Sequence, residues 1–199
     1  MGKAFSENEM SIIRQKLIES CQTCWERHGY RKTTVAEICS MSGISAASLY
    51  AFFPSKEFLF VATADHYSNL LLDILRRSLP EHPTRQDFAE GMKALVRELD
   101  KYKWLLSVRD DYEIFLRKLP PDFLKENFDK DLLDFSALIA EAGLIPKVSM
   151  EDFTAVVYTL IMSLYFSDAI GERHHAALDI LIDSVVPGLF EQERVQHGE

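Results

Sequence analysis

The sequence predicts an all-α protein. Its 199 residues include only 8 glycines and 7 prolines, and most of these lie between runs in which apolar residues recur with a helical period. Three of the runs begin with Ser or Thr followed three residues later by Asp or Glu, which is typical of helix starts. These starts are at Thr34, Thr84 and Ser149. We therefore expect about nine helices, divided between an N-terminal domain of residues 1–55 and a larger domain of residues 56–199.

The first helix is expected from about Ser6 to His28, with Gly29 ending it. Its apolar face includes Cys21 and Cys24, whose spacing also occurs in redox and zinc motifs. No second cysteine pair or close histidine completes a zinc set in the sequence. We therefore expect these two thiols to pack in the hydrophobic core.

Two short helices joined by a glycine turn are expected next. Thr34 and Glu37 can form a capping box, in which each side chain accepts a hydrogen bond from the backbone amide of the other. Gly43 can end this helix, because glycine tolerates the left-handed conformation. Ser45 can then cap a second helix over residues 46–52. Two helices joined in this way form a helix-turn-helix, whose second helix enters the major groove of DNA.

A set of residues in and around this segment matches a known pattern. The matching residues are Gly29-Tyr30, Thr33-Thr34-Val35, Glu37-Ile38, Gly43-Ile44-Ser45, Leu49-Tyr50, Phe53 and Ser55-Lys56-Glu57. Together they resemble the N-terminal DNA-binding domain of the tetracycline-repressor (TetR) family of bacterial regulators, over about a quarter of the chain. The resemblance implies an all-helical homodimer with a C-terminal domain that binds a small-molecule effector, most often acting as a repressor.

The resemblance also implies which residues contact DNA. Four residues match family positions that hold phosphates: Thr34, Ser48, Tyr50 and Lys56. Two more, Ala46 and Ala47, match positions that face base edges. The full set of predicted DNA-binding residues is Arg31, Lys32, Thr33, Thr34, Ser45, Ala46, Ala47, Ser48, Tyr50 and Lys56. The second short helix has no Arg, Asn or Gln, the usual readers of bases, so sequence preference would depend partly on DNA shape. An alternative is that Tyr50 mainly packs and the alanines simply favour a helix.

Charge is unevenly distributed along the chain. The net charge of −9 combines +1 over residues 1–60, with 7 Lys or Arg against 6 Asp or Glu, and −10 over residues 61–199, with 15 against 25. DNA binding would therefore rely on a local cationic patch rather than on the field of the whole molecule. The candidate cations are Arg27, Arg31, Lys32 and Lys56. A modest affinity for each subunit would make a dimer necessary.

Beyond Ser55 the sequence predicts longer helices separated by proline or glycine breaks. Their expected spans are about 56–78, 85–102, 103–118 and 122–143, with two more after Ser149 and around 178–190. Most aromatic residues of this region should form a core, but an apolar effector pocket between helices is also expected. The candidate lining residues are Phe88, Trp104, Tyr112, Phe115, Phe128, Phe135, Tyr158 and Met162. An apolar or aromatic effector would suit them, whereas the acidic run Asp110, Asp111 and Glu113 is better explained as a solvated face.

The last two predicted helices are apolar nearly all round, so each should be buried on two sides. A second copy of the chain could cover the face that one chain leaves open, giving a four-helix interface with the same surface on both partners. The predicted interface residues are Val157, Leu160, Ile161, Leu164, Tyr165, Leu178, Leu181, Ile182 and Val185.

The sequence contains no phosphate loop, HExxH pair or nucleophile elbow, so we do not expect an enzyme, and no cofactor is expected. Four possible metal ligands, Asp168, Glu172, His174 and His175, straddle Gly171. A surface loop explains them better than a metal site.

These observations predict a ligand-responsive transcription regulator, a repressor in most of the family, that binds a near-palindromic operator in double-stranded DNA as a homodimer. Three cysteines without a secretory leader favour the cytoplasm. The longest uncharged run, residues 153–167, is too short for a membrane span. The alternative is a helical ligand-binding or protein-docking module whose N-terminal domain no longer reads DNA.

Overall fold

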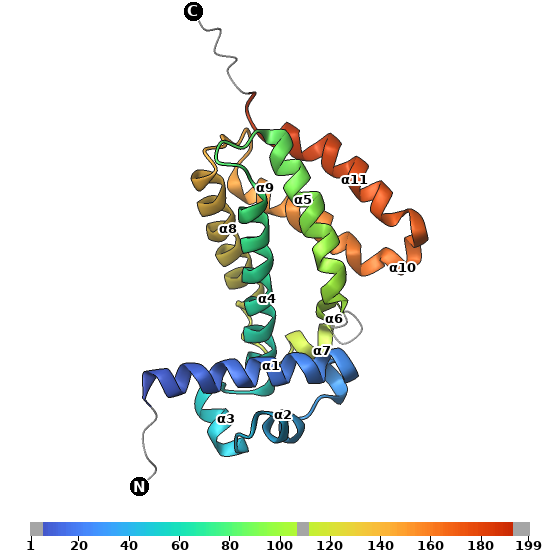
Figure 1. Cartoon of the computed structure of the whole chain (residues 1–199). Coiled ribbons are helices and arrows are strands. Elements are labelled where there is room, and N and C mark those ends of the chain that lie inside the picture. The colour runs from blue at the N-terminus through green and yellow to red at the C-terminus, as the bar shows by residue number, and fades with distance from the viewer. Residues whose placement is uncertain (1–5, 107–111, 193–199) are drawn as a thin grey trace, which may run out of the picture. The chain divides into compact units, whose positions relative to one another are not determined.

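The computed structural model describes residues 6–106 and 112–192, and its regular elements are helices (Figure 1). Eleven α-helices occur in these ranges, and three of them have only four or five residues. Within the same ranges, β-type pairing is limited to an isolated bridge between Pro146 and Phe190. The prediction of an all-α fold is confirmed.

The chain forms two compact units. The first comprises residues 1–69 and 102–121, and the second comprises residues 70–101 and 122–199. Residues 102–106 and 112–121 therefore pack with the N-terminal helices, although in sequence they lie between two helices of the second unit. The functional division at residue 55 stays a prediction.

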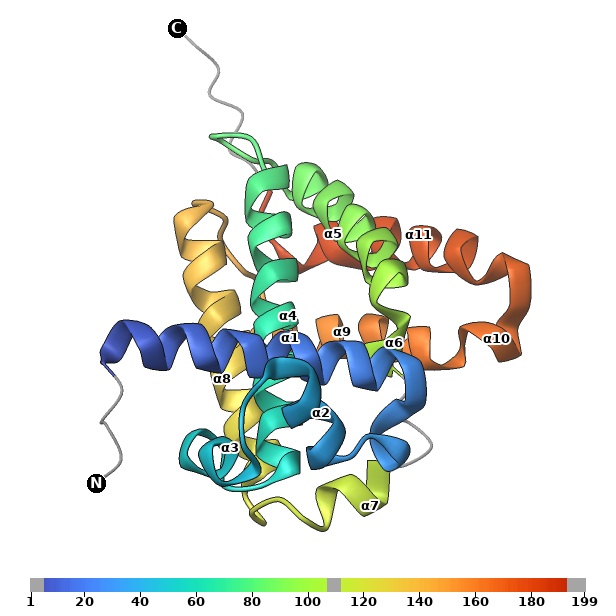
Figure 2. The same cartoon turned by 60° about the horizontal axis from the view of Figure 1, so that its bottom comes forward.

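The first unit contains the N-terminal helices and the start of a long fourth helix (Figure 2). Its elements are α1 (Glu7–Lys32), α2 (Val35–Ser42), α3 (Ala46–Phe52), the first part of α4 (Lys56–Ser78), α6 (Lys103–Leu106) and α7 (Tyr112–Leu116). Gly29 leaves the helical conformation, as predicted, with a φ of 73°. One more helical turn follows it, so α1 ends four residues later than expected. The single helix predicted over residues 103–118 is observed as α6 and α7, and residues 107–111 lie outside the described ranges.

An aromatic cluster forms the core of the first unit. The ring of Trp25 lies 4.7 Å from that of Phe60 and 5.0 Å from that of Trp104. Tyr30 makes edge contacts with Phe60 and Phe115, both at 5.1 Å between centroids. Such pairs stabilise a fold beyond the apolar area that they bury. They hold α6 and α7 against the N-terminal helices.

The three cysteines belong to the same core. Cys21, Cys24 and Cys39 are all buried, and the Cys24 sulfur lies 3.3 Å from that of Met41. Burial raises the pKa of the Cys21 thiol to about 12, so this thiol stays protonated and unreactive at neutral pH. The packing role predicted for Cys21 and Cys24 agrees with this burial.

The predicted helix starts are observed in both units. The side-chain oxygens of Thr34, Ser45 and Ser149 accept hydrogen bonds from the amides three residues ahead, at 3.1–3.2 Å. Thr84 and Asp87 form a complete capping box. Only half of the box predicted at Thr34 forms, because the Glu37 carboxylate instead lies 3.0 Å from Nε2 of His28.

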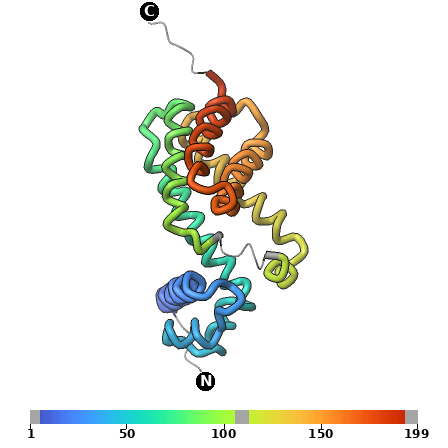
Figure 3. Tube along the Cα trace, turned by 90° about the vertical axis from the view of Figure 1, so that its right-hand side faces the viewer, coloured from blue at the N-terminus to red at the C-terminus, as the bar shows by residue number. Residues whose placement is uncertain are grey.

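The second unit consists of the rest of α4, the helix directly after it and the helices beyond residue 121 (Figure 3). They are α5 (Arg85–Leu99), α8 (Phe123–Glu141), α9 (Met150–Met162), α10 (Ser167–Ile170) and α11 (His174–Val185). The long helix expected after Ser149 is interrupted by a 3₁₀ segment that starts at Ser163. The Ser163 hydroxyl donates to the carbonyl of Leu160 at 2.7 Å, a local bond that competes with the helical pattern.

The core of the second unit is also aromatic. Phe88 lies 5.9 Å from Phe153 and 5.1 Å from Phe190, measured between ring centroids. Phe135 joins the cluster at 6.1 Å from Phe153. This cluster ties α5, α8, α9 and the C-terminal residues together.

Candidate nucleic-acid interface

The helix-turn-helix is built by α2, a glycine turn and α3. The two helices are bent by 95° at the turn, close to the angle typical of DNA-binding helix-turn-helix motifs. Gly43 has φ 69° and ψ 22°, the left-handed conformation that was predicted for it. A Cβ atom at residue 43 would meet no other atom within 4 Å. Glycine is therefore required here by the backbone angles and not by crowding.

One face of α3 is anchored in the core and the other is exposed. Leu49 is fully buried, whereas the next residue, Tyr50, is 53% exposed. Ala46 and Ala47 are exposed at the start of the helix. Ser48 is half-buried, and its hydroxyl lies 2.8 Å from that of Ser45. The exposed side chains of α3 are therefore methyl groups, a hydroxyl and one phenol, which can approach a duplex closely.

Two residues that were predicted to contact DNA, Thr33 and Lys56, make hydrogen bonds within the protein. Thr33 is only 1% exposed, and its hydroxyl donates to the carbonyl of Gly29 at 2.8 Å. The Lys56 ammonium donates to the carbonyls of Tyr30 and Thr33, both at 3.0 Å, and lies 4.2 Å from the Tyr30 ring centroid. A cation at the last carbonyls of a helix is favoured by its partial negative charge. The side chain of Thr33 is therefore corrected to a structural role, and Lys56 has such a role whether or not it also meets a phosphate.

The remaining predicted contacts outside α3 lie at the end of α1 and the start of α2. Arg31 and Lys32 are exposed in the last turn of α1, and Thr34 is exposed at the start of α2. The guanidinium of Arg14, which was not predicted to take part, lies 4.6 Å from the ring centroid of Phe53, just after α3. Its proximity arises from a contact between residues that are 39 positions apart, so no local pattern could have indicated it.

Comparison with known proteins identifies this region. Residues 17–63 match the family model described as bacterial regulatory proteins, tetR family. The N-terminal part of the chain, including α2 and α3, thus matches the DNA-binding domain of the tetR family.

Individual relatives and solved structures are also similar to this chain. The chain is 32% identical over 92 residues to the HTH-type transcriptional repressor AcnR of Corynebacterium diphtheriae, covering 42% of this chain and 48% of that protein. It thus spans about half the length of this curated relative. A TetR-family transcriptional regulator from Haemophilus influenzae has the same fold, with a TM-score of 0.57 and 15% identity over 92% of this chain and 98% of its own. The SmeT–triclosan complex has a TM-score of 0.56 and 14% identity, covering 92% and 93%.

The residues predicted to line an effector pocket are found in several places. Trp104 and Phe115 pack in the core of the first unit, and Phe88 and Phe135 pack in that of the second. Met162 is exposed. The side chain of Tyr112 and the acidic residues Asp110 and Asp111 lie outside the described part of the structure. Phe128 and Tyr158 remain together, half-buried, with 5.5 Å between their ring centroids.

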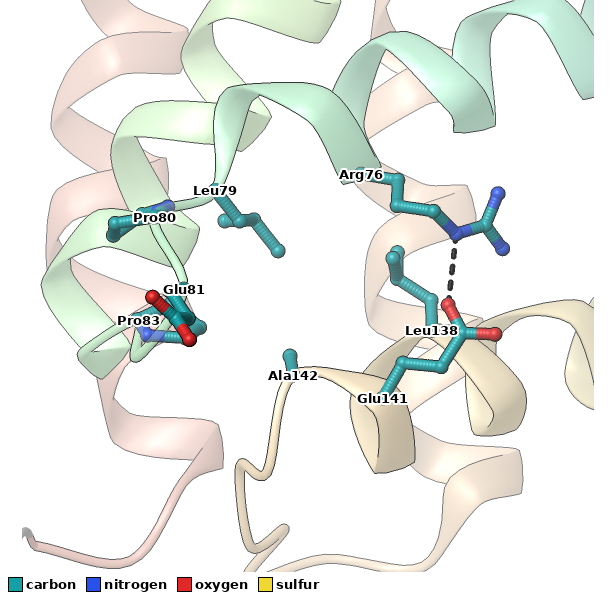
Figure 4. Close-up of a pocket in the computed structure, with 8 residues that line it drawn as sticks. All are labelled: Arg76, Leu79, Pro80, Glu81, Pro83, Leu138, Glu141 and Ala142. Atoms are coloured by element: carbon teal, nitrogen blue, oxygen red, sulfur yellow. Dashed lines mark hydrogen bonds and ion pairs between the residues drawn. The ribbon is translucent and has the colours of Figure 1, made fainter.

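A small pocket lies elsewhere in the second unit, near the end of α4 (Figure 4). Its volume is about 100 Å³, well below the usual size of a site for a drug-like ligand. Nε of Arg76 lies 2.8 Å from Oε2 of Glu141 at its rim, so the charges there already compensate each other. The lining residues are Arg76, Leu79, Pro80, Glu81, Pro83, Leu138, Glu141 and Ala142, and none of them was predicted.

The residues predicted to form the dimer interface fall into two groups. Those buried within the subunit are Val157, Leu160, Leu164, Leu178 and Ile182; their role in a dimer interface stays a prediction. Ile161 and Tyr165 are half-buried, whereas Leu181 and Val185 are exposed. Other exposed large apolar residues between α9 and α11 are Met162, Phe166, Ile170 and Ile180. The sequence predicted that these helices are apolar on most sides. It could not show which of these sides packs against other helices of the same chain.

By length and hydropathy alone, the run Met150–Leu189 would qualify as a membrane span. Helices that pack in a soluble core or against a partner have the same composition. Gly171, with a φ of 79°, interrupts this run between α10 and α11.

Of the four candidate metal ligands near Gly171, the two histidines are engaged within the subunit. His174 is buried, and Nε2 of His175 lies 2.8 Å from Oδ2 of Asp100. Within residues 6–106 and 112–192, no group of three or more potential ligands could hold a metal ion.

Proposed function

We propose that this protein is a transcription regulator that binds operator DNA in the cytoplasm as a homodimer and is released by a small-molecule effector. The observation that carries the proposal is the α2–α3 pair, which has a 95° bend and leaves Ala46, Ala47 and Tyr50 exposed. The N-terminal match to the TetR family supports it. So does the similarity to a relative named a transcriptional repressor.

DNA binding of this kind requires two copies of α3. Two recognition helices placed about 34–36 Å apart can enter successive major grooves on one side of a duplex. The exposed apolar residues between α9 and α11 offer a surface on which two copies could associate. A near-palindromic operator would then match the two-fold symmetry of the dimer.

Release by an effector requires differential binding. The effector must bind more tightly to a dimer whose two α3 helices do not fit the operator, because equal affinity for both states shifts nothing. The SmeT–triclosan complex, whose fold is similar to that of this chain, supports the proposal that the effector is a small molecule.

The alternative function is a helical ligand-binding module that no longer reads DNA. The side chains of α3 favour this alternative, since the helix offers none of the Arg, Asn or Gln groups that usually discriminate bases. Exposed methyl and hydroxyl groups still permit close approach and shape readout.

Selection of bound DNA from a random pool by the full-length protein tests the two functions. We expect enrichment of a near-palindromic sequence, with retention that falls steeply as salt rises. Ala47→Glu on the exposed face of α3 should reduce operator affinity by at least about tenfold, because it places a carboxylate against the bases or phosphates. Ala137→Glu, at an exposed alanine of α8, is the matched control and should bind as the wild type does. A pool without enrichment, or equal affinity of both variants, would contradict the proposal.

A further inference from the structure

A cluster of polar and aromatic side chains joins α8 to α9 within the second unit. The Tyr158 hydroxyl donates a hydrogen bond to Oδ2 of Asp131. Nδ2 of Asn127 lies 3.3 Å from the Tyr158 hydroxyl and 3.5 Å from the same carboxylate oxygen. The Phe128 ring packs beside Tyr158. All four residues are half-buried, so solvent-borne molecules can reach them.

The carboxylate of Asp131 is partly buried, and neutral groups make its hydrogen bonds in the described residues. Burial raises its pKa, and the hydrogen bond from Tyr158 and the nearby positive charge of Lys130 only partly oppose this effect. Both hydrogen bonds found for this carboxylate in the described residues come from neutral groups and end on Oδ2. Since an ionised carboxylate can accept about four hydrogen bonds, Oδ1 is available to a further donor.

A second polar group of α9 lacks a partner. The hydroxyl of Thr154 is buried, with the residue 0% exposed, and no described residue hydrogen-bonds to it. Other helical threonines satisfy this requirement locally, since Thr63 and Thr159 each donate to the carbonyl four residues earlier at 2.8 Å. Leaving a buried hydroxyl unpaired is costly. Thr154 lies one turn before Tyr158 on α9, and residues four apart in a helix share a face.

From this arrangement we infer that the α8–α9 cluster of Asn127, Phe128, Asp131, Thr154 and Tyr158 binds the effector and that the effector is an organic cation with an aromatic body. This inference rests on the proposed function, because it assigns a site and a chemical class to the effector. A protonated amine or amidine would donate a charge-assisted hydrogen bond to Oδ1 of Asp131. The rings of Phe128 and Tyr158 would contact its apolar part and attract the cation. Thr154 would gain a hydrogen-bond partner.

The charge of the chain supports the same ligand class. Residues 61–199 have a net charge of −10. A field of this sign raises the local concentration of cations and disfavours anions. An anionic effector would also be repelled by Asp131 at close range.

Three ligands of equal size and different charge test this inference. Benzamidinium, benzamide and benzoate are titrated into the 199-residue protein at concentrations up to about 10 mM, since ligands of this size bind weakly. Calorimetry and the melting temperature report binding. We expect benzamidinium to bind and to raise the melting temperature, with benzamide and benzoate at least about tenfold weaker. Equal binding of the three ligands, or no binding of benzamidinium, would overturn the inference.

Matched variants locate the site on the folded protein. Asp131→Asn should weaken benzamidinium binding at least about tenfold, because it removes the compensating charge. Asp129→Asn makes the same change at an exposed position of the same helix and should bind as the wild type does. Thr154→Val should raise the melting temperature of the free protein and weaken binding, because it removes the unpaired hydroxyl. Equal affinity of Asp131→Asn and Asp129→Asn would place the cation elsewhere and refute the site.

Measuring operator binding alongside benzamidinium binding distinguishes a failure of this inference from a failure of the proposed function. If the protein binds the operator but not benzamidinium, the effector assignment fails alone. If it binds benzamidinium but no DNA, the proposed function fails and the cation site stands. Release of the operator by benzamidinium, reduced in Asp131→Asn, is the result expected when both are correct.

Discussion

Lys56 was predicted to contact DNA, but its side chain also makes hydrogen bonds that stabilise the fold. The sequence places it next to the helix-turn-helix, where a phosphate contact is a reasonable expectation. Its ammonium nevertheless donates to the carbonyls of Tyr30 and Thr33, 26 and 23 residues earlier. Contacts across such separations leave no periodic signal, so the sequence could suggest that Lys56 matters without revealing what it binds.

Replacing Lys56 with Ala should therefore affect stability. The loss of two hydrogen bonds from a charged donor is expected to lower the free energy of unfolding by about 1–3 kcal/mol. Lys32→Ala, at an exposed position of α1, should leave stability within about 0.5 kcal/mol of the wild type. Urea denaturation measures both effects. If Lys56 also meets a phosphate, its removal will reduce the salt slope of DNA binding by about 1, whereas wild-type stability would contradict the structural role.

Glu57 is the most strongly perturbed carboxylate in the described part of the first unit. Burial by itself would raise its pKa, but hydrogen bonds from Tyr30, Ser55, its own amide and Lys118 lower the pKa to about 2. The Tyr30 hydroxyl donates to Oε1 of Glu57 at 2.6 Å, and Nζ of Lys118 donates to the same oxygen at 3.3 Å. A carboxylate whose pKa is lowered on folding stabilises the protein above its unfolded pKa, and this contribution is lost as pH falls towards the folded value.

Glu57→Gln should therefore destabilise the protein in a pH-dependent way. We expect a loss of about 2–3 kcal/mol at pH 7. The difference from the wild type should begin to shrink below about pH 4.5 and should continue to fall towards pH 2. Chemical denaturation at several pH values measures it. Glu81→Gln, at an exposed glutamate, serves as the control, and a difference that is independent of pH would argue against the charged network.

At the scale of single elements, the helix-turn-helix was predictable because each of its determinants is local. Thr34 and Ser45 cap their own helices, and Gly43 closes the turn, all within a dozen residues. The break in the helix after Ser149 was not predicted, because the apolar period continues through Ser163. The packing of α6 and α7 with the N-terminal helices was also missed, since it depends on contacts such as that between Trp25 and Trp104.

Gly43→Ala should weaken the turn between α2 and α3. No atom would meet the added methyl group, so the cost comes only from the positive φ and should be about 1–2 kcal/mol. Operator affinity should fall further, because the angle between α2 and α3 positions the recognition helix. Gly188→Ala, where no positive φ is required and the space is also open, is the control. Thermal unfolding of both variants measures the cost, and equal melting temperatures would refute the strained turn.

At the scale of the whole molecule, composition predicted that the last helices are more apolar than one chain requires. It could not separate the buried residues from the exposed ones, because both groups recur along the same helices. Leu164 is buried within the subunit, so Leu164→Glu would unfold the chain and could not report on association. Leu181, which is 48% exposed on α11, provides the cleaner test.

Leu181→Glu should produce folded monomers. If two copies associate through the exposed apolar residues of α9 to α11, a carboxylate at this position must be buried without a partner, at a cost of several kcal/mol for the dimer. Leu133→Glu, at a residue of α8 that is 67% exposed, makes the same change outside the proposed interface and should remain dimeric. Light scattering gives the mass of each variant, and circular dichroism checks that both are folded. Operator binding should fall together with dimerisation, because a monomer presents only one recognition helix. A dimeric Leu181→Glu would place the interface on another surface and would remove the apolar face of α11 from the proposed assembly.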